Sequence, residues 1–355
     1  MNRAIPIVLA MLAGTLARAE DKLVGGPYAI HVGPRSATVV WVVESSRVSI
    51  GTEPGKAEKT SPGLRAEKVS FTGLKPGTIY YYDTAGKEYG KGSFKTPPAG
   101  PANFQFVVYG DTRTRHDVHQ KVVNAMLKYA EPEFVLHTGD LVENGADSAQ
   151  WPTFFGIERE LLRKVAFFPS LGNHERNDRQ YYDFFEVTTP YYSFEWGSAH
   201  FIVLNSDIGN VSASPASRDA YWKEQVRWLE EDLQKSQKAD FRFLVAHHPP
   251  ITAVANRQGG NPQMTALMPL FEKYKLTAGF FGHDHNYQHY LKDGVHYFVT
   301  GGGAPLYDVS KPPEGITKLV VSTEHFVAVK VEGHTARVEA IQLDGNPLEV
   351  TELGR

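Results

Sequence analysis

The sequence predicts a layered α/β protein with a smaller all-β region in front of it. From about residue 102 to 344, short apolar strand-like runs alternate with amphipathic helical stretches, which is typical of α/β layers. From residue 23 to 95, short β-branched and aromatic runs alternate with turns, and no helical period of useful length occurs. The length of 355 residues also favours two domains, because a domain typically has about 100–200 residues.

The composition excludes several kinds of site. The chain has no cysteine, which rules out disulfides, thiolate metal sites, iron–sulfur clusters and cysteine nucleophiles. Because the formal net charge is -3 and no Lys/Arg-rich run occurs, we expect no nucleic-acid-binding surface. Neither a Gly-x-Ser-x-Gly motif nor a phosphate-loop motif is present, which disfavours serine hydrolases and P-loop enzymes.

The first 19 residues have the pattern of a secretory signal peptide. Arg3 gives a positive start, an apolar stretch of 14 residues runs from Ala4 to Ala17, and Ala17-Arg-Ala19 matches a small-x-small cleavage site. The apolar stretch is shorter than the roughly 20 residues that span a membrane. We therefore expect a cleaved leader over residues 1–19, a secreted or periplasmic protein, and no membrane span.

Residues 20–97 are expected to form a small β-sandwich domain. Strand-like runs cover 37–43, 69–71 and 79–82, and Leu74-Lys-Pro-Gly77 supplies a turn before the last of them. The segment Thr96-Pro-Pro-Ala-Gly-Pro101 has the composition of a stiff linker. We place the α/β domain at residues 98–344 and expect residues 345–355 to form a C-terminal tail.

Five strand-like runs of the α/β region are each followed by residues that can bind metals. The runs cover 104–109, 134–137, 166–171, 241–246 and 276–281, and helical stretches are expected near 116–130, 148–164, 218–236 and 264–275. The residues that follow are Gly110-Asp111, Gly139-Asp140, Gly172-Asn173-His174-Glu175, His247-His248-Pro249 and Gly282-His283-Asp284-His285. Ligands in layered α/β sheets bind at the carboxyl ends of the strands, so these five ends are expected to converge on one cleft.

The residue types at these strand ends suit a pair of metal ions. Two ions about 3.5–4 Å apart need a shared anion, and a carboxylate can bridge them. Imidazole and carboxylate bind zinc, iron and manganese alike, so the ligand set does not choose the metal. His283 and His285 are two residues apart, so in an extended segment both rings can face one cluster. Asn173 offers a neutral carbonyl oxygen.

These five motifs, in this order, resemble the calcineurin-like metallophosphoesterases over about residues 102–344. The front region, with Leu74-Lys-Pro-Gly-Thr-Ile-Tyr80 and Phe94-Lys-Thr-Pro-Pro98, resembles the fibronectin-III-like N-terminal domain of purple acid phosphatases. The combined architecture is most similar to bacterial secreted members of the purple-acid-phosphatase-like branch. The resemblance implies a four-layer β-sandwich, with two stacked sheets flanked by helices, preceded by the small all-β sandwich.

The resemblance also implies a role for each matching residue. A dinuclear centre would hold two divalent or trivalent ions (Fe, Zn or Mn) bridged by Asp140, with Asp111 and His285 at the first ion and Asn173, His247 and His283 at the second. His174 would be the catalytic residue just outside the metals, stabilising phosphoryl oxygens or protonating the leaving group. The implied reaction is hydrolysis of small phosphate esters by a metal-bound hydroxide.

Two positions depart from the pattern of the family. Where much of the wider family has a metal-binding histidine two residues after the first Asp, this chain has Arg113. Where purple acid phosphatases have a tyrosine three residues after the bridging Asp, it has Glu143. An arginine has no lone pair to give a metal, so the first site is one ligand short. Glu143, His116 or His119 could take the place of the missing histidine.

Arg113 is assigned to substrate binding, because a guanidinium beside the centre could hold the extra charge of a terminal phosphate. This assignment favours a phosphomonoesterase; a phosphodiesterase or nucleotidase is the alternative. In another interpretation, Arg113 only pairs with Glu143 or another acid and supports its loop. A catalytically silent cell-surface binding protein is the alternative from another class, and the sequence does not indicate an oligomeric state.

Overall fold

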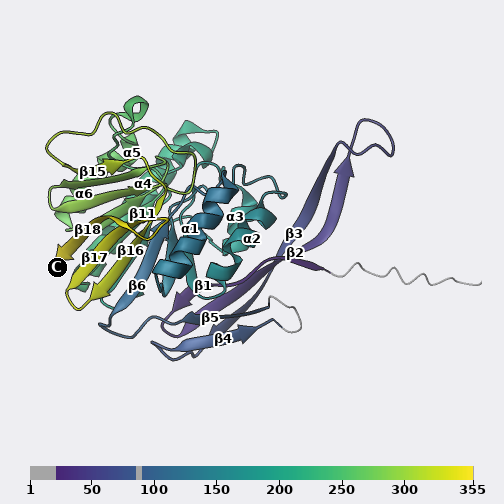
Figure 1. The fold of residues 1–355 in the computed structure, drawn as a ribbon, viewed down its shortest axis with the longest axis horizontal. Coiled ribbons are helices and arrows are strands. Elements are labelled where there is room, and N and C mark those ends of the chain that lie inside the picture. Colours follow the sequence, from purple (N-terminus) through teal and green to yellow (C-terminus); the bar gives the residue numbers. More distant parts are fainter. Residues whose placement is uncertain (1–20, 85–89, 355) are drawn as a thin grey trace, which may run out of the picture.

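Two large β-sheets lie face to face in the computed structural model, which describes residues 21–84 and 90–354 (Figure 1). One sheet has nine strands in the order β18-β17-β16-β6-β7-β8-β1-β2-β3, and the other has seven in the order β15-β13-β14-β12-β11-β10-β9. Helices pack on the outer face of each sheet. The predicted α/β fold with four layers is confirmed.

The nine-stranded sheet has a parallel centre and antiparallel sides. Its centre consists of β6 (Phe104–Tyr109), β7 (Phe134–His137) and β8 (Ala166–Pro169), which pair in parallel. Beyond β6 lie β16 (His325–Glu332), β17 (Thr335–Gln342) and β18 (Pro347–Gly354). Beyond β8 lie β1 (Lys22–Gly33), β2 (Ser36–Ile50) and β3 (Lys59–Thr72).

The seven-stranded sheet is parallel over four of its strands. These are β10 (Ala199–Val203), β11 (Phe241–Ala246), β12 (Ala278–Phe281) and β14 (Val295–Thr300). The antiparallel strands are β9 (Tyr192–Trp196), β13 (Tyr287–Lys292) and β15 (Thr317–Val321). A separate two-stranded sheet joins β4 (Ile79–Asp83) to β5 (Lys91–Lys95).

Aromatic side chains fill the space between the two large sheets. Phe106 of β6 stacks on Phe134 of β7 with ring centroids 5.0 Å apart, and Phe106 meets Phe201 of β10 edge-on at 5.2 Å. Phe243 of β11 packs against Phe106 at 5.6 Å. Since successive side chains of a strand alternate between its faces, the opposite faces of β6 and β7 are available to the helices.

Three helices cover the outer face of each sheet. The nine-stranded sheet is covered by α1 (His116–Tyr129), α2 (Trp151–Leu162) and α3 (Arg179–Phe185). The seven-stranded sheet is covered by α4 (Pro215–Lys235), α5 (Pro262–Ala266) and α6 (Met268–Lys273). The sequence predicts α1, α2 and α4 closely. The single helix expected near 264–275 divides at Leu267, because a proline at the start of α6 cannot donate a backbone hydrogen bond.

A fibronectin-III-like domain is not confirmed: the N-terminal strands form an all-β region that continues a sheet of the α/β region. β1 pairs in parallel with β8 through Ala29 and Ala166, which makes β1, β2 and β3 a continuation of the nine-stranded sheet. Tyr28 of β1 is fully buried and stacks on Phe155 of α2 with centroids 5.5 Å apart. The apolar face of β1 is therefore covered by a helix of the α/β region.

The chain ends also differ from expectation or lie outside the described residues. The expected C-terminal tail forms β18, which pairs with β17 across a turn at Asp344-Gly-Asn346 and buries Leu353 to 2 % exposure. The predicted leader over residues 1–19 lies outside the described residues. Between residues 21 and 354, apart from the gap at 85–89, no helix has the length and apolar character required to cross a membrane.

Candidate metal centre

Loops at the carboxyl ends of the central strands turn sharply and bring polar side chains together. Asp111, Asp140 and His283 have left-handed backbone conformations, with φ of 61°, 57° and 68°. Such conformations are costly for residues with a side chain and concentrate at functional sites. A Cβ atom on Gly172 would lie 2.2 Å from the backbone nitrogen of Asp140, so the close approach of these two loops requires glycine.

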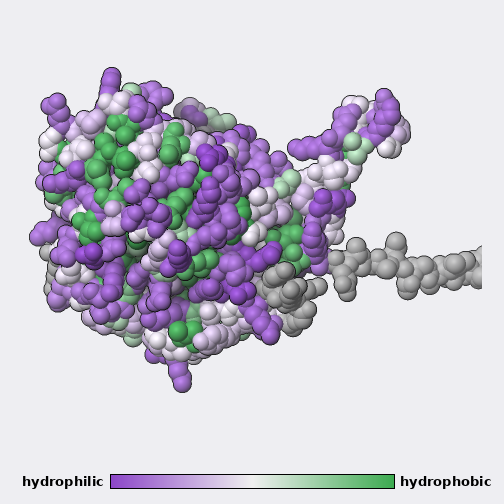
Figure 2. All heavy atoms as spheres, in the orientation of Figure 1, coloured by the Kyte–Doolittle hydropathy of each residue, from purple (hydrophilic) through white to green (hydrophobic). Residues whose placement is uncertain are grey.

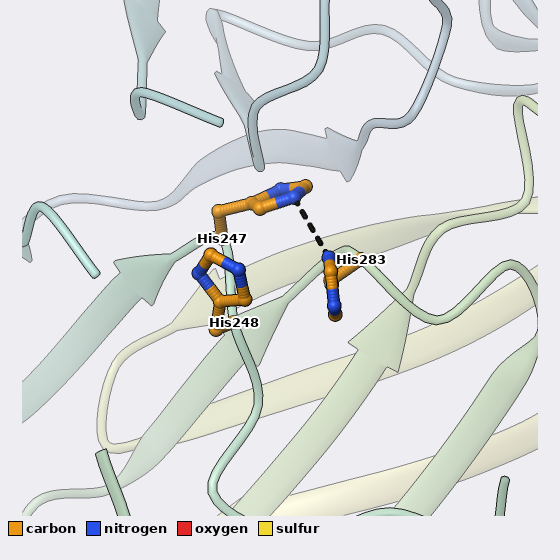
Figure 3. A group of neighbouring side chains, drawn as sticks. All are labelled: His247, His248 and His283. Carbon is orange, nitrogen blue, oxygen red and sulfur yellow. Dashed lines mark hydrogen bonds between the residues drawn. The ribbon is translucent and has the colours of Figure 1, made fainter. Parts of the chain in front are cut away.

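Four donor atoms converge at the position that the resemblance assigns to the second ion. Asn173 Oδ1 lies 3.0 Å from His247 Nε2 and 3.1 Å from His283 Nδ1. These two nitrogens are 3.2 Å apart, and Figure 3 marks their contact with a dashed line. Asp140 Oδ1 lies 3.4 Å from His247 Nε2. Ligands 2.0–2.2 Å from an ion are about 2.8–3.1 Å apart at right angles and about 3.3–3.6 Å apart at tetrahedral angles. These donors are therefore spaced to hold a metal ion.

Backbone carbonyls orient two of the histidines. His247 Nδ1 donates to the carbonyl oxygen of Thr138 at 2.9 Å, which leaves the lone pair of Nε2 facing Asn173. His285 Nδ1 donates to the carbonyl oxygen of Pro305 at 2.7 Å, so its Nε2 faces Asp111 at 3.5 Å. Such contacts fix the tautomer of metal-binding histidines.

The acid–base states of two ligands also suit a cation. Burial, and then the neighbouring His247, lowers the pKa of His283, which is thus a neutral imidazole with a lone pair to give. Burial and the negative charge of Asp111 raise the pKa of Asp140 to about 7. A cation beside Asp140 is therefore needed to keep it fully ionised at neutral pH.

The donors expected for the first ion are fewer. Asp111 accepts the backbone N–H of His283 at 3.0 Å and faces His285, while Asp140 contributes its second oxygen. Arg113 stands beside this oxygen, with Nε 3.4 Å from Asp140 Oδ2, and its Nη1 pairs with Glu143. The ion pair with Glu143 was the alternative considered for Arg113; its assignment to substrate binding stays a prediction.

The two histidines considered as replacement ligands lie elsewhere. His119 is fully buried under α2, where its Nε2 pairs with Glu158, which also accepts the hydroxyl of Tyr109. His116 is exposed at the first residue of α1. Of the three candidates, only Glu143 is near the centre, and there it is paired with Arg113.

His174 lies at the open side of the centre. Its Nδ1 donates to the backbone carbonyl of Glu143 at 2.8 Å, and its Nε2 is 3.9 Å from Asp140 Oδ2. The side chain is 22 % exposed, whereas the Asp140 side chain is 2 % exposed. The structure thus places His174 where Nε2 can meet a substrate that approaches the metal from solvent.

Sequence reasoning quoted Glu175 and His248 in motifs but gave neither a role. The buried carboxylate of Glu175 accepts backbone N–H groups of Gly172, Asp140, Leu141 and Val142 at 2.7, 3.0, 2.7 and 3.3 Å. Burial and the charge of Asp140 raise the pKa of Glu175 to about 8, yet four donors around two oxygens match only the ionised form. Glu175 therefore ties the loop of Asp140 to the loop of Asn173.

His248 lies beside two of the metal-binding candidates. Its ring centroid is 4.8 Å from that of His247 and 4.3 Å from that of His283 (Figure 3). Its Nδ1 hydrogen-bonds with Ser206 Oγ at 2.9 Å. Its position next to His247 in the sequence does not predict that both rings face the same centre, because adjacent residues of an extended segment usually face opposite sides.

Two cavities lie at opposite ends of the seven-stranded sheet, and the one near the candidate metal centre is the smaller. A cavity of about 350 Å³ is lined by His248, Arg257, Asn261 and His283, so it opens beside one of the candidate metal ligands. A cavity of about 660 Å³ lies at the amino ends of β11 and β12, where Arg242 and Thr277 line it. The smaller cavity is on the side where ligands bind in such sheets, at the carboxyl ends of the strands.

Comparisons with known proteins agree with this arrangement. The family model described as calcineurin-like phosphoesterase matches residues 104–287, which is more than half of the chain. Purple acid phosphatase 1 of Ipomoea batatas is 27 % identical over 268 residues, covering 66 % of this chain and 54 % of that protein. Tartrate-resistant acid phosphatase type 5 of Sus scrofa is 29 % identical over 278 residues, covering 68 % and 81 %.

The fold is shared with a solved plant structure. A purple acid phosphatase from yellow lupin (Lupinus luteus) seeds matches 93 % of this chain and 74 % of its own, with a TM-score of 0.72 and 16 % sequence identity. The chain spans about half to two thirds of the length of the plant relatives that it matches. With the family model matching its strand-end motifs, this chain belongs to the calcineurin-like phosphoesterase family, and its homologues include purple acid phosphatases.

Proposed function

We propose that this chain is a metal-dependent phosphoesterase that hydrolyses small phosphate esters, with monoesters preferred over diesters. The observation that carries the proposal is the convergence of Asp140, Asn173, His247 and His283, whose donor atoms lie 3.0–3.4 Å from one another in four measured pairs. The preference for monoesters is supported by relatives named acid phosphatases and a phosphoenolpyruvate phosphatase of Allium cepa.

The proposed chemistry divides between the metal and the side chains around it. A bound zinc, iron or manganese ion supplies a Lewis acid that activates water near neutral pH, so no side chain needs to act as nucleophile. His174 Nδ1 donates to the carbonyl of Glu143, so Nε2 faces the substrate and carries a proton only in the imidazolium form of the ring, the form that this role requires. In this position it can stabilise the charge that develops on the phosphoryl oxygens or protonate the leaving group.

The cavity beside the centre is proposed to take the leaving group. Its lining combines the metal-binding His283 with the side chains of Arg257 and Asn261. Arg257 donates to the carbonyl oxygen of His283 at 2.7 Å and to Asp284 Oδ1 at 2.6 Å, so its charge is partly balanced. A volume of about 350 Å³ suits a small leaving group.

The test compares turnover of an aryl phosphate monoester with that of a bis-aryl phosphate diester before and after metal removal. We expect hydrolysis of both to stop after chelation, to return with Zn²⁺, Mn²⁺ or Fe²⁺, and to be faster for the monoester. His283→Ala should lose metal and activity, whereas the matched control His334→Ala, whose side chain is 70 % exposed, should keep both. Equal turnover with chelator would refute metal dependence, and a faster diester would favour the phosphodiesterase alternative.

Export from the cytoplasm is a further part of the proposal. It rests on the pattern of residues 1–19, which lie outside the described residues. N-terminal sequencing of the exported protein should then begin near Glu20, and a sequence that still begins with Met1 would contradict it.

A further inference from the structure

We infer that Arg113 replaces one metal ion of the dinuclear centre, so that this chain binds a single ion, at the site of Asp140, Asn173, His247 and His283. The inference rests on the proposed function, because it concerns the same centre. It differs from the expectation of two ions that the resemblance implies.

The two oxygens of Asp140 face different cations. Oδ1 lies 3.4 Å from His247 Nε2, within the converging donor set, and accepts the backbone N–H of His174 at 3.0 Å. Oδ2 lies 3.4 Å from Arg113 Nε. A bridging carboxylate needs a positive charge on each side, and here the guanidinium supplies the second one.

Arg113 is held in this place by its surroundings. Its Nη1 pairs with Glu143, and only 14 % of its side chain is exposed. The buried Nε makes no hydrogen bond to any described residue and lies 3.4 Å from Asp140 Oδ2. Arg113 and Glu143 occupy the two positions at which this chain departs from the family, and they neutralise each other instead of offering two ligands.

The donor count agrees with this reading. Apart from Asp140, the first position has Asp111 and His285, whose Oδ1 and Nε2 atoms are 3.5 Å apart. Since Asp140 Oδ2 faces Arg113, these are the two remaining donors, one fewer than the three or four protein ligands that zinc and similar ions normally take, and a guanidinium cannot be the third.

The balance of charge agrees as well. Asp111, Asp140 and Glu143 bring three negative charges to this part of the site, and Arg113 brings one positive charge. One divalent ion brings the sum of these four charges to zero, while the charge of the nearby Glu175 is stabilised by its four backbone N–H donors. A second divalent ion would leave an excess of positive charge next to Arg113, and charge that is buried without a partner is costly.

The test counts metal ions in the full-length protein. The protein is stripped with chelator, dialysed against excess Mn²⁺, desalted and analysed for manganese per chain, and the electron paramagnetic resonance spectrum distinguishes an isolated Mn²⁺ ion from an exchange-coupled pair. We expect about one ion per chain with an isolated-ion spectrum. Arg113→His, which supplies a ligand and removes the guanidinium, should bind about two ions with a coupled spectrum.

The matched control is Arg179→His, an arginine whose side chain is 87 % exposed on α3, which should bind one ion. Two ions in the wild-type protein would overturn the inference and leave the proposed function intact, whereas none would overturn the proposed function. If a folded Arg113→His variant still binds one ion, Arg113 is not what excludes the second. If this variant does not fold, the wild-type count and spectrum decide alone.

Discussion

Replacing Glu175 by glutamine tests how the loops of the metal centre are held together. The change keeps the volume and shape of the side chain but replaces one carboxylate oxygen with an NH₂ group. Each oxygen of Glu175 accepts two backbone N–H groups: Oε1 those of Leu141 and Val142, and Oε2 those of Asp140 and Gly172. Whichever oxygen is replaced, two buried N–H groups lose their acceptor and face another donor.

The expected loss of stability follows from these contacts. A hydrogen bond to a charged group contributes about 1.5–3 kcal/mol, so two of them amount to about 3–6 kcal/mol. Glu175 is 0 % exposed, so water cannot replace the lost acceptor without opening the loops. A folded protein is typically stable by only about 5–15 kcal/mol, so the variant should lose a large part of that margin.

The free energy of unfolding is measured by urea denaturation of chelator-treated wild-type and Glu175→Gln protein, so that loss of metal does not contribute. The midpoint should fall markedly with little change in the slope. Glu231→Gln is the matched control: this residue is 51 % exposed on α4, with ion pairs worth less than about 1 kcal/mol. If the free energy of unfolding of Glu175→Gln is within about 1 kcal/mol of the wild-type value, the carboxyl group of Glu175 is protonated in the native protein and the charged arrangement described above is wrong.

Two further predictions concern histidines with different tasks. His174→Ala should keep its metal, because His174 is outside the donor set, but lose about 10²–10⁴-fold in kcat; a wild-type rate would remove it from the mechanism. His200 is held between Asp232 and Glu195, at 2.6 Å from each. Burial alone would lower its pKa, but these hydrogen bonds raise it to about 9, above the ordinary value near 6.5. The stability that these two hydrogen bonds contribute is therefore fully present below pH 6.5 and is lost as the pH rises toward 9. We expect the free energy of unfolding to fall by about 1–3 kcal/mol over this range, a modest amount because Glu195 is partly solvated. His200→Gln should not show this fall. The same pH dependence in that variant would contradict the assignment.

The strand ends of the centre are predictable because their information is local. An apolar run followed by glycine and a polar residue marks both the strand and the point where it ends, as at Val108 to Asp111. Strand β10, by contrast, was not predicted. It has only five residues, one of them His200, and what allows that polar ring at 5 % exposure is Asp232 on a distant helix.

Which strand an apolar strand pairs with is also not predictable from a single sequence. The run within β2 predicts a strand but not that β1 will join β8, since the alternating pattern of a sandwich and of a sheet edge is the same. The role of Glu175 depends on backbone N–H groups that every residue except proline carries. The position of Arg113 depends on a loop 30 residues away that brings Glu143 to it.

The long β2–β3 hairpin, which extends from the body of the molecule, begins in strands that are part of the main sheet (Figures 1 and 2). Its outer residues Val48 and Ile50 are 61 % and 64 % exposed, whereas Val40 and Val42 at its base are within the core. A protein shortened to begin after residue 97 would therefore leave β8 as an open sheet edge with Phe155 uncovered, a surface prone to aggregation. The two sequence regions should melt in one cooperative transition, and an active fragment is better sought by trimming the hairpin tip than by removing the N-terminal strands.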